Sequence, residues 1–310
     1  MEDNLVVQSN DLVVASYTMT TREKELLLAC ISQVDSRPDA PNINKQTKFT
    51  ITIDEVKRLF YGDSNAQNIY RDIEQASNRL FDREVTIELP ANETLRTRFV
   101  SSVLFSPDLG QVRLTFAEEI LPYLTQLKAN FTKYKLLEIS ELSSIHAIRL
   151  YELIICWLGQ YQYSKTYELD DFKYIMGVSG KYQKFSQLKS RVIETAITEI
   201  NESTNYNISV DFIKKSRGKG YKGLTLKFHR KTLDKLAGEN GLSPDTIRSI
   251  VDNPQFMNDY NDHKKLSHQG RMDVKTFKDE MFHIIQIEPE SFDKKGKGLE
   301  SYLPKVKQGE

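Results

Sequence analysis

The sequence contains two cysteines, no long apolar run and no net charge. Cys30 and Cys156 lie in separate apolar stretches, with no second cysteine or histidine at metal-binding spacing. We therefore expect buried free thiols and neither a zinc site nor a disulfide framework. The apolar runs are shorter than the roughly 20 residues of a membrane-spanning helix, and the first residues lack the basic start of a secretory signal. These absences predict a cytoplasmic protein that does not contact membranes.

Signals for catalysis are equally scarce. The five histidines include no His-x-His pair, although a metal-dependent DNA-nicking enzyme would need such a pair beside its nucleophilic tyrosine. The glycine-rich stretch 214–223, "KKSRGKGYKG", lacks the Ser or Thr that closes a phosphate-binding loop, and it precedes a predicted strand rather than a helix. The sequence therefore predicts no catalytic residue, no metal and no cofactor, and an enzyme is not expected.

What the sequence does contain is an internal repeat. Residues 52–60 ("TIDEVKRLF") match residues 168–176 ("ELDDFKYIM"), and in both copies an Asp is predicted to cap a short helix. Each copy then passes through a polar turn into a longer helix with an apolar stripe, and afterwards into alternating β-rich sequence. Two helices followed by a β-hairpin make a winged helix-turn-helix. We therefore predict an α+β fold of two tandem winged helix-turn-helix domains related by internal duplication, plus a C-terminal extension.

These patterns divide the chain into three segments. Residues 1–130 are assigned to an N-terminal winged-helix domain, residues 131–232 to a C-terminal winged-helix domain, and residues 233–310 to a helical extension and tail of unknown role. Between the two copies, a short helix and a connecting segment precede a strongly apolar helix that opens the second domain. Outside the repeated units, helices are predicted near residues 20–34, 117–128, 144–158, 243–253 and 273–286.

Cations are concentrated in the second copy, although the 43 basic and 43 acidic side chains of the whole chain cancel. Between Lys181 and Lys231, twelve cations stand against four acidic residues, a local excess of eight positive charges. Such a basic footprint is what binding to nucleic-acid phosphates requires. Polar residues lie opposite or beside the apolar stripe of the longer helix, and cations lie at the tip of the hairpin, the wing. The candidate DNA-binding residues are Lys184, Gln187, Lys189, Ser190 and Arg191 on the helix, and Lys214, Lys215, Arg217, Lys219 and Lys222 on the wing.

The first copy offers fewer charges for the same task. Its candidate DNA-binding residues are Gln67, Arg71 and Asn78 on the longer helix, and Arg96 and Arg98 on the hairpin. Two simpler interpretations stay open, the first for both copies and the second for the second copy. A charged helix face is often only a solvated face, and the glycine- and lysine-rich wing could be a disordered loop.

Three stretches resemble the initiator proteins of iteron-containing bacterial plasmids, the Rep type with two winged-helix domains. They are "NDLVVASYTMTTREKELLLACI" near the start, "LPYLTQLKANFTKYKLLEISELSSIHAIRLYELI" at the domain junction, and "FSQLKSRVIETAITEINESTNYNISVDFIKKSRGKGYKGLTLKF" in the second domain. The resemblance extends over residues 4–230, about three quarters of the chain. The segment after residue 231 has no counterpart in it.

The resemblance implies a double-stranded-DNA-binding protein that recognises direct repeats, the iterons, at a plasmid origin. Such initiators help to melt the adjacent AT-rich DNA and recruit host replication proteins such as a helicase or the host initiator. They bind iterons as monomers, and as dimers joined through the first domain they bind an operator inverted repeat and repress their own promoter. The resemblance places the main base contacts on the helix of the second copy, with the first domain at the other end of the repeat. A winged-helix transcriptional repressor without initiator activity is the alternative.

Overall fold

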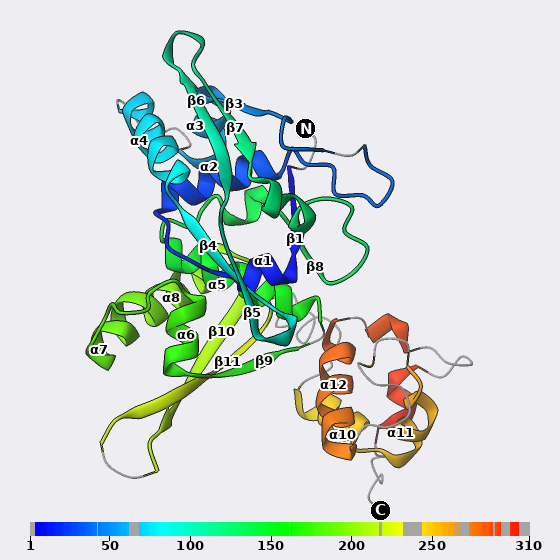
Figure 1. Cartoon of the computed structure of the whole chain (residues 1–310). Coiled ribbons are helices and arrows are strands. Elements are labelled where there is room, and N and C mark those ends of the chain that lie inside the picture. The colour runs from blue at the N-terminus through cyan, green and yellow to red at the C-terminus, as the bar shows by residue number, and fades with distance from the viewer. Residues whose placement is uncertain are drawn as a thin grey trace, which may run out of the picture. The chain divides into compact units, whose positions relative to one another are not determined.

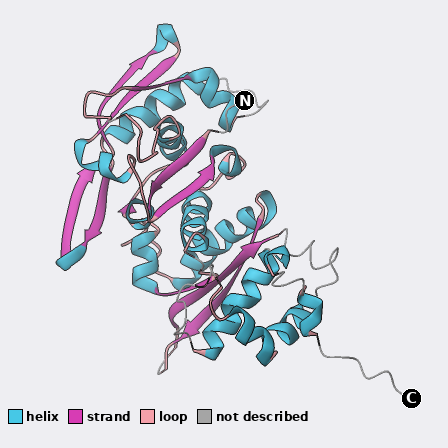
Figure 2. Cartoon of the chain, turned by 90° about the vertical axis from the view of Figure 1, so that its right-hand side faces the viewer, coloured by secondary structure: helices cyan, strands magenta, loops and turns pink. Residues whose placement is uncertain are grey.

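The computed structural model describes residues 4–41, 43–61, 68–160, 162–216, 219–231, 244–263, 266, 273–287, 289–292 and 298–303. The chain divides into two compact units. The first holds residues 1–159, 165–204 and 208–226, and the second holds residues 160–164, 205–207 and 227–310. Figure 1 shows the order of the elements, and Figure 2 shows that helices and strands are mixed along most of the chain. None of the described helices is long and apolar enough to cross a membrane.

Both copies of the repeat have the predicted pair of helices followed by strands. The short helices are α3 (Ile53–Phe60) and α6 (Leu169–Ile175). The sequence-based assignment of their caps is wrong, because the N-cap residues are Thr52 and Glu168 rather than the aspartates. The Thr52 side chain and Glu55 form a reciprocal capping box, which satisfies two backbone N–H groups at once. The aspartates lie in the first helical turn, where a negative charge is favoured by the helix dipole.

The longer helices differ between the copies. In the first copy, α4 (Ile69–Phe81) is a regular helix whose predicted apolar stripe is buried. In the second copy, the helix runs from α7 (Phe185–Leu188) through a π-helical segment (Lys189–Glu194) into α8 (Thr195–Ser203). The prediction of one continuous α-helix is therefore wrong for its middle part. A π turn uses i→i+5 geometry and is rare outside functional sites.

The sheets reveal which hairpin is the wing of the first copy. In the second copy, the sheet order is β10-β11-β9, and the strand that precedes the helices pairs with the second strand of the hairpin. The sheet β6-β7-β3 of the first copy has the same connectivity, so β6 and β7 form its wing. The bounds are β3 (Phe49–Thr52), β6 (Val100–Ser106), β7 (Gln111–Phe116), β9 (Ser164–Glu168), β10 (Tyr206–Lys214) and β11 (Tyr221–Arg230).

The remaining strands of the first copy belong to other sheets. A separate sheet has the order β2-β4-β5, with β2 (Ser16–Tyr17), β4 (Glu84–Leu89) and β5 (Glu93–Arg98). The first strand, β1 (Leu5–Ser9), pairs antiparallel with β8 (Phe131–Lys135), a strand in the stretch for which the sequence predicted only a connection. The helix expected near residues 117–128 is a shorter 3₁₀ helix, Glu118–Tyr123.

The predicted helices at the start and at the junction are present. The helix α2 (Thr21–Ile31) has the expected capping box of Thr20 and Glu23. The short α1 (Asn10–Val14) precedes it, and α5 (Ile145–Leu158) begins after Ser144 as predicted. The helix α5 is buried along almost its whole length and packs on α1, α2, α8 and β8. It therefore joins the cores of the two copies.

A buried ionic cluster lies where the copies meet. Arg149 on α5 is 1% exposed and donates to the backbone oxygens of Ala15 and Ile175, at 2.8 and 2.6 Å. One turn later, the fully buried carboxylate of Glu152 lies 2.9 Å from the ammonium of Lys24. Because Ala15 precedes β2 and Ile175 ends α6, the Arg149 guanidinium ties the first copy to the second.

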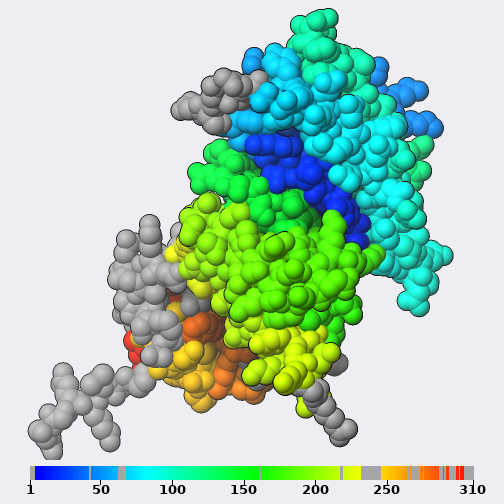
Figure 3. Space-filling model, turned by 90° about the vertical axis from the view of Figure 1, so that its left-hand side faces the viewer, coloured from blue at the N-terminus to red at the C-terminus, as the bar shows by residue number. Residues whose placement is uncertain are grey.

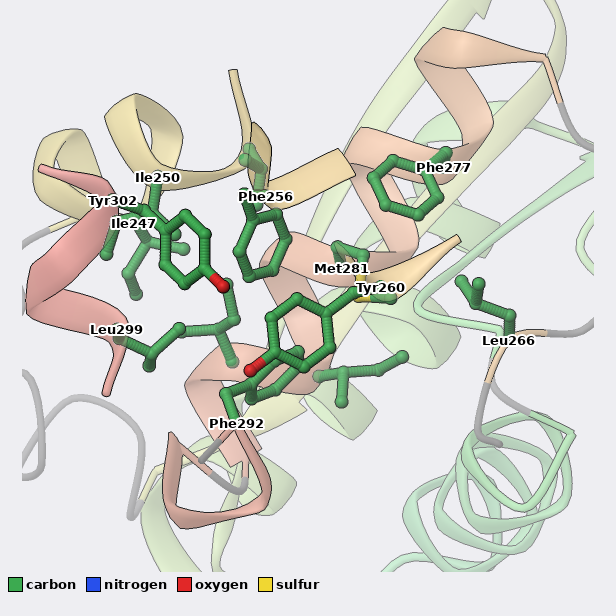
Figure 4. Packing of buried hydrophobic residues seen from close by; sticks show 13 residues of the cluster. Ile247, Ile250, Phe256, Tyr260, Leu266, Phe277, Met281, Phe292, Leu299 and Tyr302 are labelled. Carbon is green, nitrogen blue, oxygen red and sulfur yellow. The ribbon is translucent and has the colours of Figure 1, made fainter. Parts of the chain in front are cut away.

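The second unit contains a core of its own. Its described helices are α10 (Pro244–Val251), α11 (Pro254–Tyr260) and α12 (Val274–Ile287), of which the first and third match the sequence-based prediction. The sequence predicts Ser243 as the N-cap of α10, and this residue lies outside the described residues. Figure 4 shows the buried side chains between the helices, where the ring of Phe256 contacts those of Tyr260, Phe292 and Tyr302. The described residues of the C-terminal extension therefore form a packed helical module, and the predicted tail beyond residue 303 lies outside the described residues.

Candidate nucleic-acid interface

The longer helix of the second copy presents its predicted polar residues to solvent. Lys184, Gln187, Ser190 and Arg191 are exposed, and Lys189 is half-buried at the flank. The opposite side packs into the core through Leu188, Val192, Ile193, Ala196 and Ile200. The helix and its neighbours form part of the face that Figure 3 presents. The amide of Gln187 and the guanidinium of Arg191 are thus free to reach the edges of bases.

An aromatic cluster ties the start of this helix to the wing. The ring of Phe185 is stacked on Tyr221 of β11, with centroids 4.3 Å apart, and meets Phe212 of β10 edge-on at 5.2 Å. The ammonium of Lys189 lies 5.5 Å from the centroid of the Phe212 ring, within the range of a cation–π contact. The sequence placed Phe185 in the apolar stripe of the helix but gave no sign that it packs on the wing. These contacts fix the angle between helix and wing.

The wing carries an exposed array of ammonium groups. Lys214, Lys215, Lys219 and Lys222 are all exposed, whereas Arg217 lies outside the described residues. The tip is closed by a hydrogen bond from the Lys215 N–H to the Gly220 oxygen, 3.1 Å long. Exposed ammonium groups of this kind can neutralise the phosphates of DNA.

Two glycines of the wing have different tasks. Gly220 has a φ of +113°, a backbone conformation that a side chain would strain, so it serves the turn at the tip. From the sequence alone, Gly223 would be expected to let the wing approach DNA, but it is buried in β11, and a Cβ there would lie 2.4 Å from the Tyr167 oxygen of β9. Gly223 therefore permits close packing of the sheet.

The candidates of the first copy are scattered. Arg71 and Asn78 are exposed on α4, whereas Gln67 lies outside the described residues. Arg96 and Arg98 lie on β5 and therefore not on the wing of this copy. The first is hydrogen-bonded to Glu84, and the second donates to the Phe81 oxygen at 3.2 Å. The first copy thus brings fewer free cations to its surface than the second.

The wing of the first copy has a different chemical character. Its tip is the 3₁₀ turn Pro107–Leu109, and Leu104 and Leu109 are 51% and 67% exposed. Tyr70 at the start of α4 is 51% exposed, and its hydroxyl lies 3.3 Å from where a Cβ of Gly110 would be. The wing of the first copy therefore exposes apolar side chains, whereas the wing of the second copy exposes lysines.

The described part of the chain contains no cluster of metal-binding side chains. No three His, Cys, Asp or Glu side chains among the described residues are close enough to hold a metal ion. His146 is half-buried on α5, and burial, together with the charge of Lys181, lowers its pKa. Cys30 and Cys156 are buried free thiols as predicted, and burial raises the pKa of Cys30 to about 12.

Known families match both copies. The family described as Initiator Replication protein, WH1, matches residues 5–155, and the one described as Initiator Rep protein, WH2, matches residues 168–228. The chain belongs to this family of initiators. The expected resemblance and the fold of two winged helices are confirmed. We refer to the two matched regions as WH1 and WH2 below. Neither match includes the C-terminal module.

Individual relatives agree with the family assignment. A replication initiation protein of Escherichia coli is 26% identical over 215 residues, covering 68% of this chain. The chain spans 66% of the length of that relative. An uncharacterised 27.6 kDa protein of the same species is 22% identical over 208 residues, which is 64% of this chain and 85% of the relative.

A solved structure shows the same fold. The Pi initiator protein, crystallised in complex with iteron DNA, aligns with a TM-score of 0.60 and 20% identity. The alignment covers 74% of this chain but 98% of the Pi chain. The fold of this chain therefore includes nearly all of the Pi fold and extends beyond it.

Proposed function

We propose that the protein is a plasmid replication initiator that binds iterons at the origin, with WH2 as the main sequence-specific DNA-binding domain. The observation that carries this proposal is the exposed basic helix and wing of WH2, held together by aromatic contacts, in a chain of the initiator family. The Pi initiator, which has the same fold, was crystallised on iteron DNA. We assign base reading to Gln187 and Arg191, and phosphate binding to the wing lysines.

WH1 is proposed to contact the other end of the same repeat. Arg71 and Asn78 are exposed on α4, and Figure 1 shows α4 and α7 toward the same side of the unit. Two winged helices in one compact unit can occupy successive grooves of a duplex, and the first contact raises the effective concentration of the second. Gln67 is assigned to the same contact. Arg96 and Arg98 are assigned a lesser part, because both already bond to neighbouring groups of WH1.

We also propose that the chain exchanges between monomer and dimer, and that the dimer represses its own promoter. The support is the exposure of three large apolar or aromatic side chains on WH1, Tyr70, Leu104 and Leu109, which a second copy could cover. The strand β6 lies at the edge of its sheet and contains no charged residue, although charges are a common protection against edge pairing. Opening of the origin and recruitment of host replication proteins are further parts of the proposal. Sedimentation of the full chain over a range of concentrations measures the exchange.

A replication assay in bacterial cells distinguishes a replication initiator from a transcriptional repressor with the same fold. The DNA flanking the gene is placed on a circle that lacks another origin, and the full chain is supplied as the sole plasmid-encoded factor. An initiator maintains the circle, and an Arg191→Ala variant, which loses a base contact, maintains it poorly. If the chain binds a flanking site specifically but never maintains the circle, the protein acts as a repressor.

Replacing Lys215, Lys219 and Lys222 together by alanine should weaken binding to every DNA sequence. Each phosphate contact contributes about 0.9 to the slope of log K against log salt, so the slope should become shallower by up to about 2.7. The measurement is a binding titration at several salt concentrations. The matched control replaces Lys48, Lys128 and Lys133, which are exposed in WH1 outside its two helices and its wing, and should leave the slope unchanged. Equal slopes for the wing variant and the wild type would contradict the assignment of the wing to phosphate.

A further inference from the structure

The π-helical segment creates an ion pair within the DNA-facing helix. The ammonium of Lys189 lies 3.3 Å from the carboxylate of Glu194, five residues later. In a regular α-helix, residues i and i+5 are separated by about 140° around the axis and do not meet. In a π turn the fifth residue comes back above the first, and the Thr195 hydroxyl donates to the Ser190 oxygen across the same turn, at 2.8 Å. The π turn thus sets the direction of Glu194.

Glu194 lies on the surface that carries the candidate DNA-binding residues. The exposed side of the helix includes Gln187, Ser190, Arg191, Glu194, Thr195 and Thr198. The Glu194 side chain is 49% exposed, so its carboxylate can accept further hydrogen bonds beside the one partner that it has. Glu194 is not among the residues predicted from the sequence, because cations and amides are the side chains expected to bind phosphates and bases.

A carboxylate in this position weakens binding to DNA unless the DNA offers it a hydrogen-bond donor. Close to phosphates, its negative charge opposes binding, and the oxygen atoms would lose water. In the major groove, exocyclic amino groups are the donors of the bases, and glutamate typically accepts from N4 of cytosine. The neighbouring Lys189 holds the carboxylate and offsets part of the repulsion. A carboxylate placed in this way penalises every sequence that lacks the amino group.

We propose that Glu194 is a specificity-determining residue of WH2 that accepts a hydrogen bond from the N4 amino group of a cytosine. The proposal rests on the proposed DNA-binding function and names one of the base preferences of that site. It predicts that one position of the bound sequence is read by an acidic side chain. Discrimination at this position comes from repulsion of wrong sequences as much as from attraction of the right one.

The test selects binding sites from a randomised duplex library with the full-length wild type and the Glu194→Ala, Glu194→Gln and Glu202→Gln variants. Glu202 is exposed on the same helix, two turns later, and its variant removes the same charge. The wild type should require cytosine at one position, with a penalty of between about 5-fold and 100-fold for other bases. Glu194→Ala should abolish that penalty and tighten binding to random DNA. Glu194→Gln should shift the preference towards adenine, because glutamine pairs with adenine N6 and N7.

The outcomes separate this proposal from the function on which it rests. If the wild type enriches no sequence, sequence-specific binding itself fails. If the wild type enriches a site and Glu194→Ala keeps the same base preferences at every position, the assignment of Glu194 is wrong. A purely structural role would lower the affinity for all sites equally and leave the preferences intact. The Glu202→Gln variant should retain the wild-type preferences, and loss of the same cytosine there would also overturn the proposal.

Discussion

Replacing Glu152 by glutamine should lower the free energy of unfolding of the first unit, which contains both winged helices, by about 3–5 kcal/mol. We call this unit the winged-helix unit below. The substitution keeps the shape of the side chain but removes its charge. Glu152 is fully buried and lies 2.9 Å from the Lys24 ammonium. Its oxygens also accept hydrogen bonds of 2.8 Å from Gln8 and from the Tyr134 hydroxyl. In the variant, buried cations lose their counter-charge, which costs far more than the loss of a surface ion pair.

Urea unfolding followed by tryptophan fluorescence measures this effect. Trp157 is the single tryptophan of the chain and is buried on α5, so its signal reports the winged-helix unit. The matched control is Glu141→Gln, because Glu141 is exposed. Adding Lys24→Met to the Glu152→Gln background should restore part of the loss, since the unpaired ammonium is then absent. A loss below about 1 kcal/mol in Glu152→Gln would show that the cluster does not hold the unit together.

The same cluster predicts how stability depends on pH. Burial by itself raises the pKa of Glu152, but the charges of Lys24 and Arg149 outweigh burial, and the pKa lies below the ordinary value of 4.5. A carboxyl group with a lowered folded-state pKa contributes stability above its unfolded pKa and loses it as the pH falls through the folded pKa. The wild type should therefore lose stability below about pH 4.5, and the Glu152→Gln variant should lose less over the same range.

Much of the fold could be predicted from the sequence because the apolar patterns are local. The helices α4 and α5 follow directly from the spacing of their apolar residues, and the capping box of α2 from the spacing of Thr20 and Glu23. The strand β8 was missed, because its partner β1 lies more than a hundred residues earlier and pairing at that distance leaves no local pattern. The wing of WH1 was ambiguous for a related reason. Its identity depends on pairing with β3, which strand propensity does not show.

The candidate site was predictable as a surface but not in its geometry. Lys184, Gln187 and Arg191 follow from charge and helical spacing, and the structure exposes them together. The π turn does not follow from spacing, because one extra residue in a turn leaves the apolar pattern of the helix almost unchanged. The contact of Phe185 with the wing is likewise a tertiary contact. The sequence could show which side of the helix is polar, but not how the Glu194 carboxylate is directed.

The contact between the β2 segment of the first copy and the end of α6 in the second, which we call the seam, also depends on one glycine. Gly177 follows α6 with a φ of +67°, and a Cβ there would lie 1.8 Å from the backbone oxygen of Tyr17. On either side of this contact, Ser16 donates to the Tyr174 oxygen at 2.8 Å and Thr18 to the Gly177 oxygen at 2.9 Å. A methyl group at Gly177 would therefore push the β2 segment of the first copy away from the second.

Gly177→Ala should lower the free energy of unfolding of the winged-helix unit by roughly 2–5 kcal/mol, and Gly180→Ala by about 1–2 kcal/mol. Both glycines have a positive φ, but a Cβ at Gly180 would meet no atom within 4 Å. The difference between the two variants thus isolates the steric contact with Tyr17 from the backbone strain that they share. The measurement is again urea unfolding followed by Trp157 fluorescence. Equal losses in the two variants would show that the β2 segment moves aside freely, and the seam would then not fix the spacing of the two winged helices on DNA.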